Sequence, residues 1–263
     1  MKAPVGSPTP RRKETQTRVV VAGGTGLIGS RTVARLRDHG MEVVSVSREE
    51  GVDIITGEGL AEVLRGAEVV VDVTDAPTRT EKASVDFFGT ATATLVEAAA
   101  AAGAEHYVVL SVVGVERLKS GYFRAKLLQE DQVRRSPIPF SSIVRATPFF
   151  ESVETTMLMN TYADSVHVAP VLMRPVSAND VAAAVAHVAV GVPLAGILQV
   201  AGPEEHRLDD LAAKLLAARG DLRDVVADTH VPFFGAEIGE RTLLPAPDAH
   251  LGHETFAQWL ARR

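Results

Sequence analysis

Short runs of β-branched and aliphatic residues alternate along the chain with longer stretches in which apolar residues recur at helical spacing. Nearly continuous apolar runs are typical of strands that are covered on both faces, and the intervening period predicts amphipathic helices. This alternation predicts an α/β fold, a doubly wound parallel sheet with right-handed crossovers. The predicted strands are residues 18–22, 42–46, 68–74, 106–111, 140–145 and 197–201, with 53–55 as a further short candidate. The predicted helices are residues 27–39, 60–65, 81–102, 121–135, 179–190 and 208–218, with a last candidate at 254–261.

The regular alternation loosens after Arg145. Residues 147–175 mix apolar and polar side chains without a clear period, and residues 229–263 contain a second irregular region. We expect these two regions to form a small substrate lobe over the carboxyl ends of the strands, where ligands bind in open α/β sheets. Residues 1–17 are rich in Pro, Lys, Arg and Thr and contain no apolar signal-peptide core, so we predict a disordered tail before a domain at 18–263.

The first predicted strand ends in a glycine-rich turn whose residues are Gly23-Gly24-Thr25-Gly26-Leu27-Ile28-Gly29. Gly23 can adopt the backbone angles of a sharp exit from the strand, and Gly26 has no Cβ to keep a phosphate at a distance. Gly29 lets the following helix lie close to the sheet, and the helix N-terminus offers unpaired N–H groups to an anion. The turn therefore predicts a dinucleotide site, with a plain strand–helix turn as the alternative. Its G-x-x-G-x-x-G spacing differs from the G-x-G-x-x-G of ordinary dehydrogenases.

The second predicted strand ends at Val46-Ser47-Arg48, where an acidic residue would bind the ribose hydroxyls of NAD. A guanidinium suits bidentate contact with a phosphate, so Arg48 favours NADPH over NADH. Arg31, just inside the first helix, is a second candidate for the adenosine phosphate. The alternative is that Arg48 is only a solvated loop charge, and Glu49 and Glu50 follow it directly.

A second group of candidate residues follows the strand that ends at Ser111. Ser120 is a plausible N-cap for the next helix, which places Tyr122 and Lys126 on one face, one turn apart. A nearby ammonium and a helix N-terminus both favour the phenolate, so we expect a lowered pKa for Tyr122. Ser111 would hold a carbonyl oxygen, Tyr122 would give it a proton, and Lys126 would hold the nicotinamide ribose. The alternative is a half-buried tyrosine beside a lysine whose aliphatic stem packs on the protein.

Composition restricts the chemistry further. The 263 residues include no cysteine, which excludes disulfides, thiolate nucleophiles and zinc–thiolate sites and agrees with a reducing cytoplasm. The net charge of −6 argues against broad nucleic-acid binding, and no apolar run approaches the length of a membrane span. His250 and His253 are interpreted as surface residues, so no metal site is expected. A cytoplasmic protein with a small-molecule substrate fits these observations, and the oligomeric state stays open.

Several motifs together resemble the extended and atypical short-chain dehydrogenase/reductases, and most of all their NmrA-like NAD(P)-binding group. The resemblance covers roughly residues 18–262 and implies a Rossmann fold with a small C-terminal substrate lobe. It further implies that Gly23, Thr25, Gly26, Leu27, Ile28 and Gly29 surround the phosphates, that Val73 and Thr74 line the adenosine side, and that Ala146 and Thr147 lie near the nicotinamide. The motifs are the glycine turn, Leu110-Ser111-Val112-Val113-Gly114, Tyr122-Phe123-Arg124-Ala125-Lys126, Ile143-Val144-Arg145-Ala146-Thr147 and Arg174-Pro175-Val176-Ser177-Ala178-Asn179-Asp180-Val181.

These observations predict an NADPH-dependent oxidoreductase that reduces a carbonyl, an enone or a quinone of small to medium size, with Tyr122 as acid or base. Two alternatives stay open. One is a regulator that senses the dinucleotide without turnover, although such relatives usually lack the Tyr-Lys pair that this chain keeps. The other is an isomerase, epimerase or dehydratase on the same fold. The Asn of classical members has no counterpart in residues 90–94, so the proton path is left open.

Overall fold

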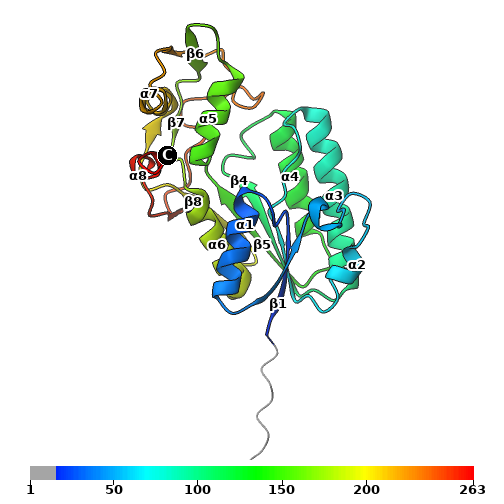
Figure 1. The fold of residues 1–263 in the computed structure, drawn as a ribbon. Coiled ribbons are helices and arrows are strands. Elements are labelled where there is room, and N and C mark those ends of the chain that lie inside the picture. The colour runs from blue at the N-terminus through cyan, green and yellow to red at the C-terminus, as the bar shows by residue number, and fades with distance from the viewer. Residues whose placement is uncertain (1–15) are drawn as a thin grey trace, which may run out of the picture.

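The computed structural model describes residues 16–263, so most of the predicted N-terminal tail lies outside the described residues. A seven-stranded, fully parallel sheet in the order β11-β8-β5-β4-β3-β1-β2 forms its centre (Figure 1). The doubly wound α/β fold is confirmed. Its strands are β1 (Arg18–Ala22), β2 (Glu42–Val46), β3 (Val69–Asp72), β4 (His106–Val112), β5 (Phe140–Ala146), β8 (Ile197–Ala201) and β11 (His250–Leu251).

Helices cover both faces of this sheet, which explains why its strands are apolar on both sides. On one face, α1 (Leu27–Asp38) and α6 (Ala178–Val190) pack on alternate residues of β1, β3, β4 and β5. On the other face lie α2 (Leu60–Val63), α3 (Glu81–Ala101) and α4 (Gly121–Arg134) (Figure 1). The two faces receive alternate side chains of each strand. Polar side chains such as Asp72, Ser111 and Arg145 share the parity of residues that face α3 and α4.

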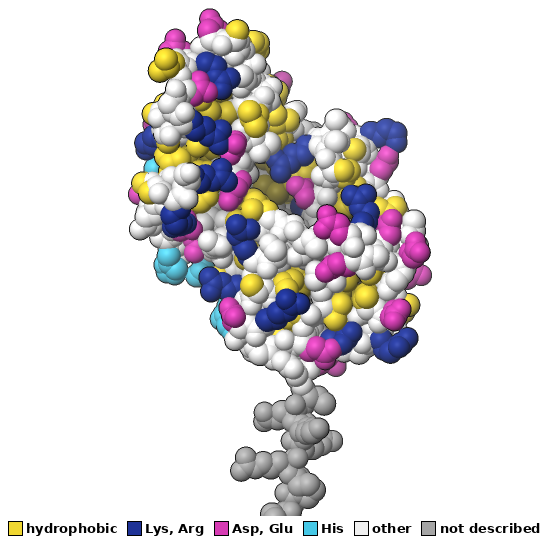
Figure 2. Space-filling view, viewed as in Figure 1, with side chains coloured by type: hydrophobic (Ala, Val, Ile, Leu, Met, Phe, Trp, Pro, Cys, Tyr) yellow, Lys and Arg dark blue, Asp and Glu magenta, His cyan; other side chains and the backbone are white. Residues whose placement is uncertain are grey.

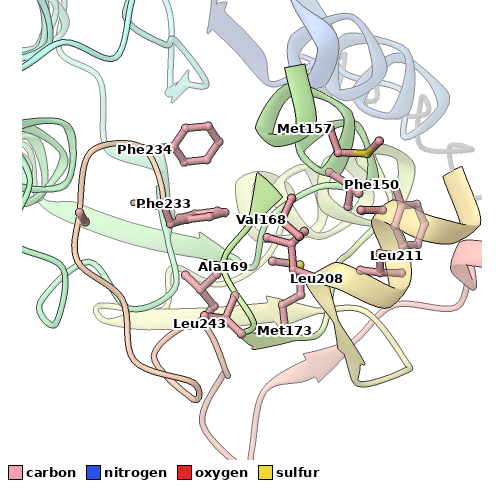
Figure 3. Close-up of a cluster of buried hydrophobic side chains, with 14 of the residues drawn as sticks. Phe150, Met157, Val168, Ala169, Met173, Leu208, Leu211, Phe233, Phe234 and Leu243 are labelled. Carbon is pink, nitrogen blue, oxygen red and sulfur yellow. The ribbon is translucent and has the colours of Figure 1, made fainter. Parts of the chain in front are cut away.

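A smaller lobe stands beside the carboxyl ends of the strands. Its core joins Phe150, Met157, Val168, Leu208 and Leu211 and continues through Phe233 to the rings of α3 and α4 (Figure 3). The elements of the lobe are α5 (Phe150–Met159), β6 (Ser165–Val168), β7 (Leu172–Met173), β9 (His206–Arg207), α7 (Leu208–Ala218), β10 (Asp224–Ala227) and α8 (Phe256–Leu260), and the short helix η1 (Arg48–Glu50) follows β2.

The structure corrects the expected pattern in three places. Residues 53–55 are a turn and not a strand, because the Asp53 carboxylate accepts hydrogen bonds from the N–H groups of Ile55 and Thr56. The region after Arg145 that showed no clear period contains the ten-residue helix α5. Residues 250–251, in the second irregular region, form β11 and pair with β8 in the central sheet. None of the helices within residues 16–263 is both long and apolar enough to cross a membrane.

Candidate active site

A cleft of about 790 Å³ opens between the carboxyl edge of the sheet and the lobe, and Figure 2 shows the hollow between them. Residues far apart in the chain meet there, because parallel strands all deliver their following loops to the same edge. The cleft brings together every predicted site residue except Gly29 and the second phosphate candidate Arg31. These are Gly23, Thr25, Gly26, Leu27, Ile28, Arg48, Val73, Thr74, Ser111, Tyr122, Lys126, Ala146 and Thr147.

The glycine turn forms an open cradle at one end of the cleft. Gly23 has a φ of +79° and its N–H donates to the Val46 carbonyl at 2.9 Å, so the turn is fixed to the end of β2. Gly26 is the N-cap of α1, and neither a side-chain cap nor an acidic residue occupies the first turn of that helix. A Cβ at Gly26 would meet only the Gly23 carbonyl oxygen, at 3.3 Å. Unpaired N–H groups at an uncapped helix start therefore fit a dinucleotide phosphate.

Gly29 has a different role. A Cβ there would lie 1.9 Å from the carbonyl oxygen of Gly23, so only glycine allows α1 to pack against the turn. Gly29 does not line the cleft. It acts on the shape of the cradle from behind, as its expected packing role requires.

The adenosine side of the cleft contains Arg48, which is exposed in η1 and has no ion-pair partner among residues 16–263. The nearby Glu50 carboxylate accepts hydrogen bonds from the hydroxyls of Ser45 and Ser47, at 2.9 and 3.0 Å. Arg31, the second candidate for the adenosine phosphate, does not line the cleft. Its guanidinium donates to the Asn179 side chain at 3.0 Å and to the Leu27 carbonyl at 2.7 Å.

Tyr122 is buried at the start of α4. Ser120 stands at the N-cap position of this helix, but its hydroxyl makes no capping hydrogen bond, contrary to the expectation. The rings of Phe88 and Phe123 pack edge-on against it, and its hydroxyl donates to Asp75 Oδ1 at 3.1 Å. The predicted lowering of its pKa is wrong. Burial and the Asp75 charge raise the pKa of Tyr122 well above its usual value, and Arg79 opposes this only in part.

Lys126 is also buried, and within the described chain no hydrogen bond joins its ammonium group to the tyrosine hydroxyl. It donates to the Leu110 carbonyl at 2.7 Å and to the Gln129 side chain, and it lies 4.5 Å from the centre of the Phe88 ring. Gln129 in turn donates to the buried Asp72 carboxylate at 2.9 Å. Burial lowers the pKa of Lys126, while the charges of Asp75 and Asp72 act in the opposite direction. Lys126 still borders the cleft, close to the expected place of a nicotinamide ribose.

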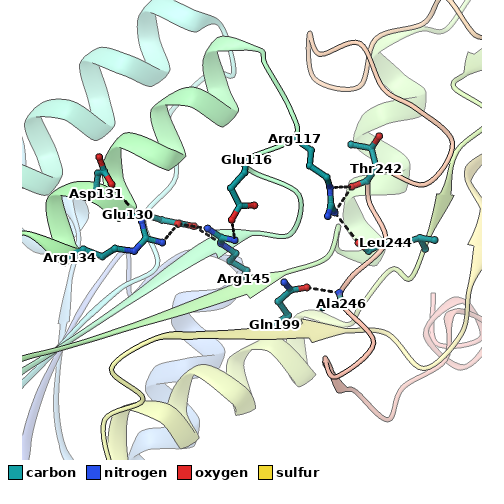
Figure 4. Close-up of polar contacts among 10 residues, drawn as sticks. All are labelled: Glu116, Arg117, Glu130, Asp131, Arg134, Arg145, Gln199, Thr242, Leu244 and Ala246. Atoms are coloured by element: carbon teal, nitrogen blue, oxygen red, sulfur yellow. Dashed lines mark hydrogen bonds and ion pairs between the residues drawn. The ribbon is translucent and has the colours of Figure 1, made fainter.

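A buried ion pair lies behind Ser111. The guanidinium of Arg145, on β5, donates to both oxygens of Glu130 at 2.8 and 2.6 Å and also contacts Glu116 (Figure 4). Burial raises the pKa of Glu130, but the bonds from Arg145 outweigh it and hold that pKa below the usual value. The pair fixes α4 to β5. The Ser111 hydroxyl lies beside the Glu130 carboxylate and helps to hold the pKa of that group below its usual value.

Sequence reasoning missed two side chains at the centre of the cleft. Asp75 and Arg79 lie between β3 and α3, and both line the cleft beside Tyr122. Asp75 carried a signal, because a carboxylate shortly after a buried parallel strand lies at the functional edge of the sheet. Arg79 carried none. No group of three or more His, Asp or Glu side chains in the described part of the chain is arranged to hold a metal.

Comparison with known proteins agrees with this geometry. Residues 23–190 match the model of a family described as NAD(P)H-binding. The chain is 30% identical over 139 residues to a (4-alkanoyl-5-oxo-2,5-dihydrofuran-3-yl)methyl phosphate reductase of Streptomyces griseus, covering 48% of this chain and 46% of that protein. It is 31% identical over 207 residues to a chloroplastic divinyl chlorophyllide a 8-vinyl-reductase of Oryza sativa, covering 65% and 51%. The chain thus spans about half the length of these relatives.

Solved structures show the same fold. A short-chain dehydrogenase/reductase superfamily protein of Agrobacterium tumefaciens with bound NAD superposes with a TM-score of 0.69 at 19% identity, over 93% of this chain and 95% of the other. The matched segment of the family model begins at the glycine turn and includes β2, Tyr122, Lys126 and α6. The chain therefore belongs to the NAD(P)H-binding family and has the fold of the short-chain dehydrogenase/reductases.

Proposed function

We propose that the protein is an NADPH-dependent reductase that acts on a carbonyl, an enone or a quinone of small to medium size. One observation carries this proposal. An uncapped helix N-terminus, the buried Lys126 and the Tyr122 hydroxyl all border the same cleft. Anion cradle, cation and proton donor are the groups that a nicotinamide-dependent reduction needs side by side. Both of the relatives described above are reductases by name, which supports the same class of reaction.

The residues of the cleft fit a dinucleotide along its whole length. The open face of Gly26 and the N–H groups of α1 would hold the pyrophosphate, and Val73 and Thr74 would border the adenosine. Arg48 would pair with a 2′-phosphate, because its guanidinium is exposed and no carboxylate among residues 16–263 holds it. Glu50 is engaged by two serine hydroxyls, which supports NADPH over NADH. Ala146 and Thr147 would lie beside the nicotinamide.

Tyr122 would act as the acid. When bound, the reduced nicotinamide supplies a hydride to the substrate. The raised pKa keeps Tyr122 a neutral phenol at physiological pH, so its hydroxyl can donate a proton to the oxygen atom on which negative charge develops. The Ser111 hydroxyl, which borders the cleft beside Tyr122, would orient that oxygen atom. Lys126 would hold the ribose with the N–H that is not engaged by Leu110 and Gln129.

The wall of the cleft beyond Tyr122 favours a flat, unsaturated substrate. Aromatic rings pack well against conjugated ring systems, face to face or edge to face. Among the residues that the structure describes, Asp75, Arg79, Lys126 and Glu151 bring charge to this part of the cleft, and Asp75 is paired with Arg79. Six aromatic side chains form this wall, namely Phe87, Tyr122, Phe123, Phe149, Phe233 and Phe234.

The test combines binding with turnover. Calorimetry should show that NADPH binds more tightly than NADH, and absorbance at 340 nm should show that NADPH is consumed with at least one member of a panel of quinones, cyclic enones and aromatic ketones. Tyr122→Phe should keep the cofactor affinity and lose turnover. Consumption of NADPH that is equal in wild type and Tyr122→Phe would remove Tyr122 from the reaction.

A sensing protein without turnover is the second candidate, and the contact between Tyr122 and Asp75 is the observation that favours it. A hydroxyl that is already satisfied by a carboxylate can be a purely structural group. Equal affinity for NADP⁺ and NADPH, together with no reduction anywhere in the panel, would establish this second candidate.

A further inference from the structure

We propose that Asp75 is the positioning residue for the Tyr122 hydroxyl, and that Arg79 holds Asp75 in place for this task. Sequence spacing pointed to Lys126 as the partner of Tyr122, but the structure assigns Lys126 to Leu110 and Gln129. The Tyr122 hydroxyl instead donates to Asp75 Oδ1 at 3.1 Å. The catalytic part of this inference rests on the proposed reductase function, whereas its structural part does not.

The Asp75 carboxylate is held on both sides. Its Oδ1, which accepts the hydrogen bond from the Tyr122 hydroxyl, also accepts a hydrogen bond from the Ala76 N–H at 3.0 Å. Its other oxygen pairs with Arg79 Nη2 at 3.4 Å. The preceding residue, Thr74, is bound through its N–H and its hydroxyl to the buried Asp72 at 3.0 and 2.6 Å. The segment after β3 therefore presents Asp75 to Tyr122 from a rigid turn.

Arg79 links this pair to the lobe. Its guanidinium carbon lies 4.0 Å from the centre of the Phe234 ring and 5.1 Å from the centre of the Tyr122 ring. Cations are attracted to the faces of aromatic rings, so Arg79 bridges the carboxylate, the phenol and the far wall of the cleft. Phe234 has a φ of +47°, which a phenylalanine adopts only where its surroundings hold it.

This arrangement completes the path of the proton. In the reduction, the carbonyl carbon gains a hydride, the C=O pair moves to oxygen, and that oxygen takes the proton as the Tyr122 O–H bond breaks. The phenolate then has to regain a proton from water. Asp75 reaches solvent, with 47% of its side chain exposed, while Tyr122 is buried, so Asp75 connects the phenol to the bulk. No other acidic side chain in the described chain bonds to this hydroxyl.

The two partners act on Tyr122 with opposite signs. The Asp75 anion disfavours a neighbouring phenolate and Arg79 favours it. The other charged groups nearby are Lys126, which faces Leu110 and Gln129, and Glu151, which α5 brings into the cleft without contact to Tyr122. Asp75→Asn should therefore let Tyr122 ionise at lower pH, and Arg79→Gln should have the reverse effect.

The experiment titrates Tyr122 in the full-length protein by NMR of ¹³C-labelled tyrosine ring carbons. The chain has only three tyrosines, and Tyr122→Phe identifies the resonance. In the wild type and in Arg79→Gln, the Tyr122 resonance should stay phenolic throughout the alkaline range in which the protein is folded. In Asp75→Asn the ring Cζ resonance of Tyr122 should differ from that of the wild type at neutral pH, because the hydroxyl loses the carboxylate that accepts its hydrogen bond, and any titration should begin at lower pH. Glu97→Gln, an exposed change on α3 outside the cleft, is the matched control and should match the wild type.

Turnover gives the second readout. Any loss of kcat/KM at high pH should set in at lower pH in Asp75→Asn than in the wild type, whereas Glu97→Gln, outside the cleft, should match the wild type. An unchanged Tyr122 resonance in folded Asp75→Asn overturns the inference, whether or not the protein reduces anything. A shifted resonance in a protein that consumes no NADPH keeps the positioning role and contradicts the proposed reductase function instead.

Discussion

The glycine turn and the start of α4 border the same cleft, but they are built in different ways. At the turn, function depends on the backbone: Gly26 leaves space in front of the helix N-terminus and Gly29 removes a collision behind it. At α4, the arrangement depends on side chains that come from another segment, since the Tyr122 hydroxyl donates to Asp75 and the Tyr122 ring contacts Arg79. A site built from the backbone can be recognised in consecutive residues of the sequence. A site built from side chains of separate segments can be recognised only in the folded structure.

The largest effect is expected from two alanine substitutions at the turn, which separate packing from binding. Gly29→Ala places a Cβ 1.9 Å from a carbonyl oxygen and should lower the free energy of unfolding by about 4 kcal/mol or more. Gly26→Ala should fold with a loss of at most about 1 kcal/mol but bind NADPH about tenfold more weakly, because its Cβ enters the phosphate cradle. Thermal melts and calorimetry measure both. Equal stability of the two variants would contradict the distinction.

Tyr122→Phe tests the side-chain half of the comparison. Removal of the proton donor should lower kcat about 10²- to 10³-fold and leave the Kd of NADPH within about twofold, because the ring still packs against Phe88 and Phe123. Tyr162→Phe is the matched control, since Tyr162 is exposed and outside the cleft. Steady-state kinetics with the best quinone or enone measure the loss. A similar loss in both variants would assign the effect to general destabilisation.

Glu130→Gln tests how much the buried ion pair between α4 and β5 contributes to the free energy of unfolding. The substitution leaves Arg145 without its main partner and should cost about 3 kcal/mol at pH 7. Because folding lowers the pKa of Glu130 below 4.5, its stabilisation is complete above pH 4.5 and is lost as the pH falls through the native value. Urea unfolding should therefore show the variant and the wild type converging in acid. Glu97→Gln, an exposed change on α3, should stay within about 0.5 kcal/mol of wild type at every pH.

The smallest effect is expected at Arg48, which follows β2 and is the proposed partner of the adenosine phosphate. Arg48→Ala should reduce the preference for NADPH over NADH about tenfold, since one charge-assisted contact to a phosphate is lost. Arg31→Ala is the control, because Arg31 is held by Asn179 outside the cleft. Parallel titrations with both cofactors measure the ratio. A change of preference in Arg31→Ala and none in Arg48→Ala would reverse the assignment.

The contrast between the two regions also explains how far the sequence could be interpreted. The sheet, its flanking helices and the glycine turn were predictable, because strand, turn and helix signals lie within short windows. The pair of Tyr122 and Lys126 was visible as a helical spacing, but spacing does not say which way each side chain points. In the structure, the buried Lys126 donates to Leu110 and Gln129. The Tyr122 hydroxyl donates instead to Asp75, which lies in the segment after β3.

The lobe was the least predictable part for a related reason. Its helix α5 and strands β6, β7, β9 and β10 are short and gain their stability from one another, as the core in Figure 3 shows. Elements of this kind depend on tertiary packing more than on local preference. The strand β11 pairs with the edge strand β8, and no local sequence pattern predicts this pairing.

The central claim is that hydride and proton reach the substrate from two different sources in one cleft. Reduction of an aromatic ketone with NADPH deuterated at the transferred position of C4 tests this directly, with mass spectrometry of the product and NMR of the cofactor. We expect an alcohol that carries one cofactor deuteron on the former carbonyl carbon and an exchangeable hydroxyl proton from solvent, formed at a wild-type rate that Tyr122→Phe does not reach. Retention of the deuteron on the cofactor, with the substrate unchanged or only isomerised, would contradict it.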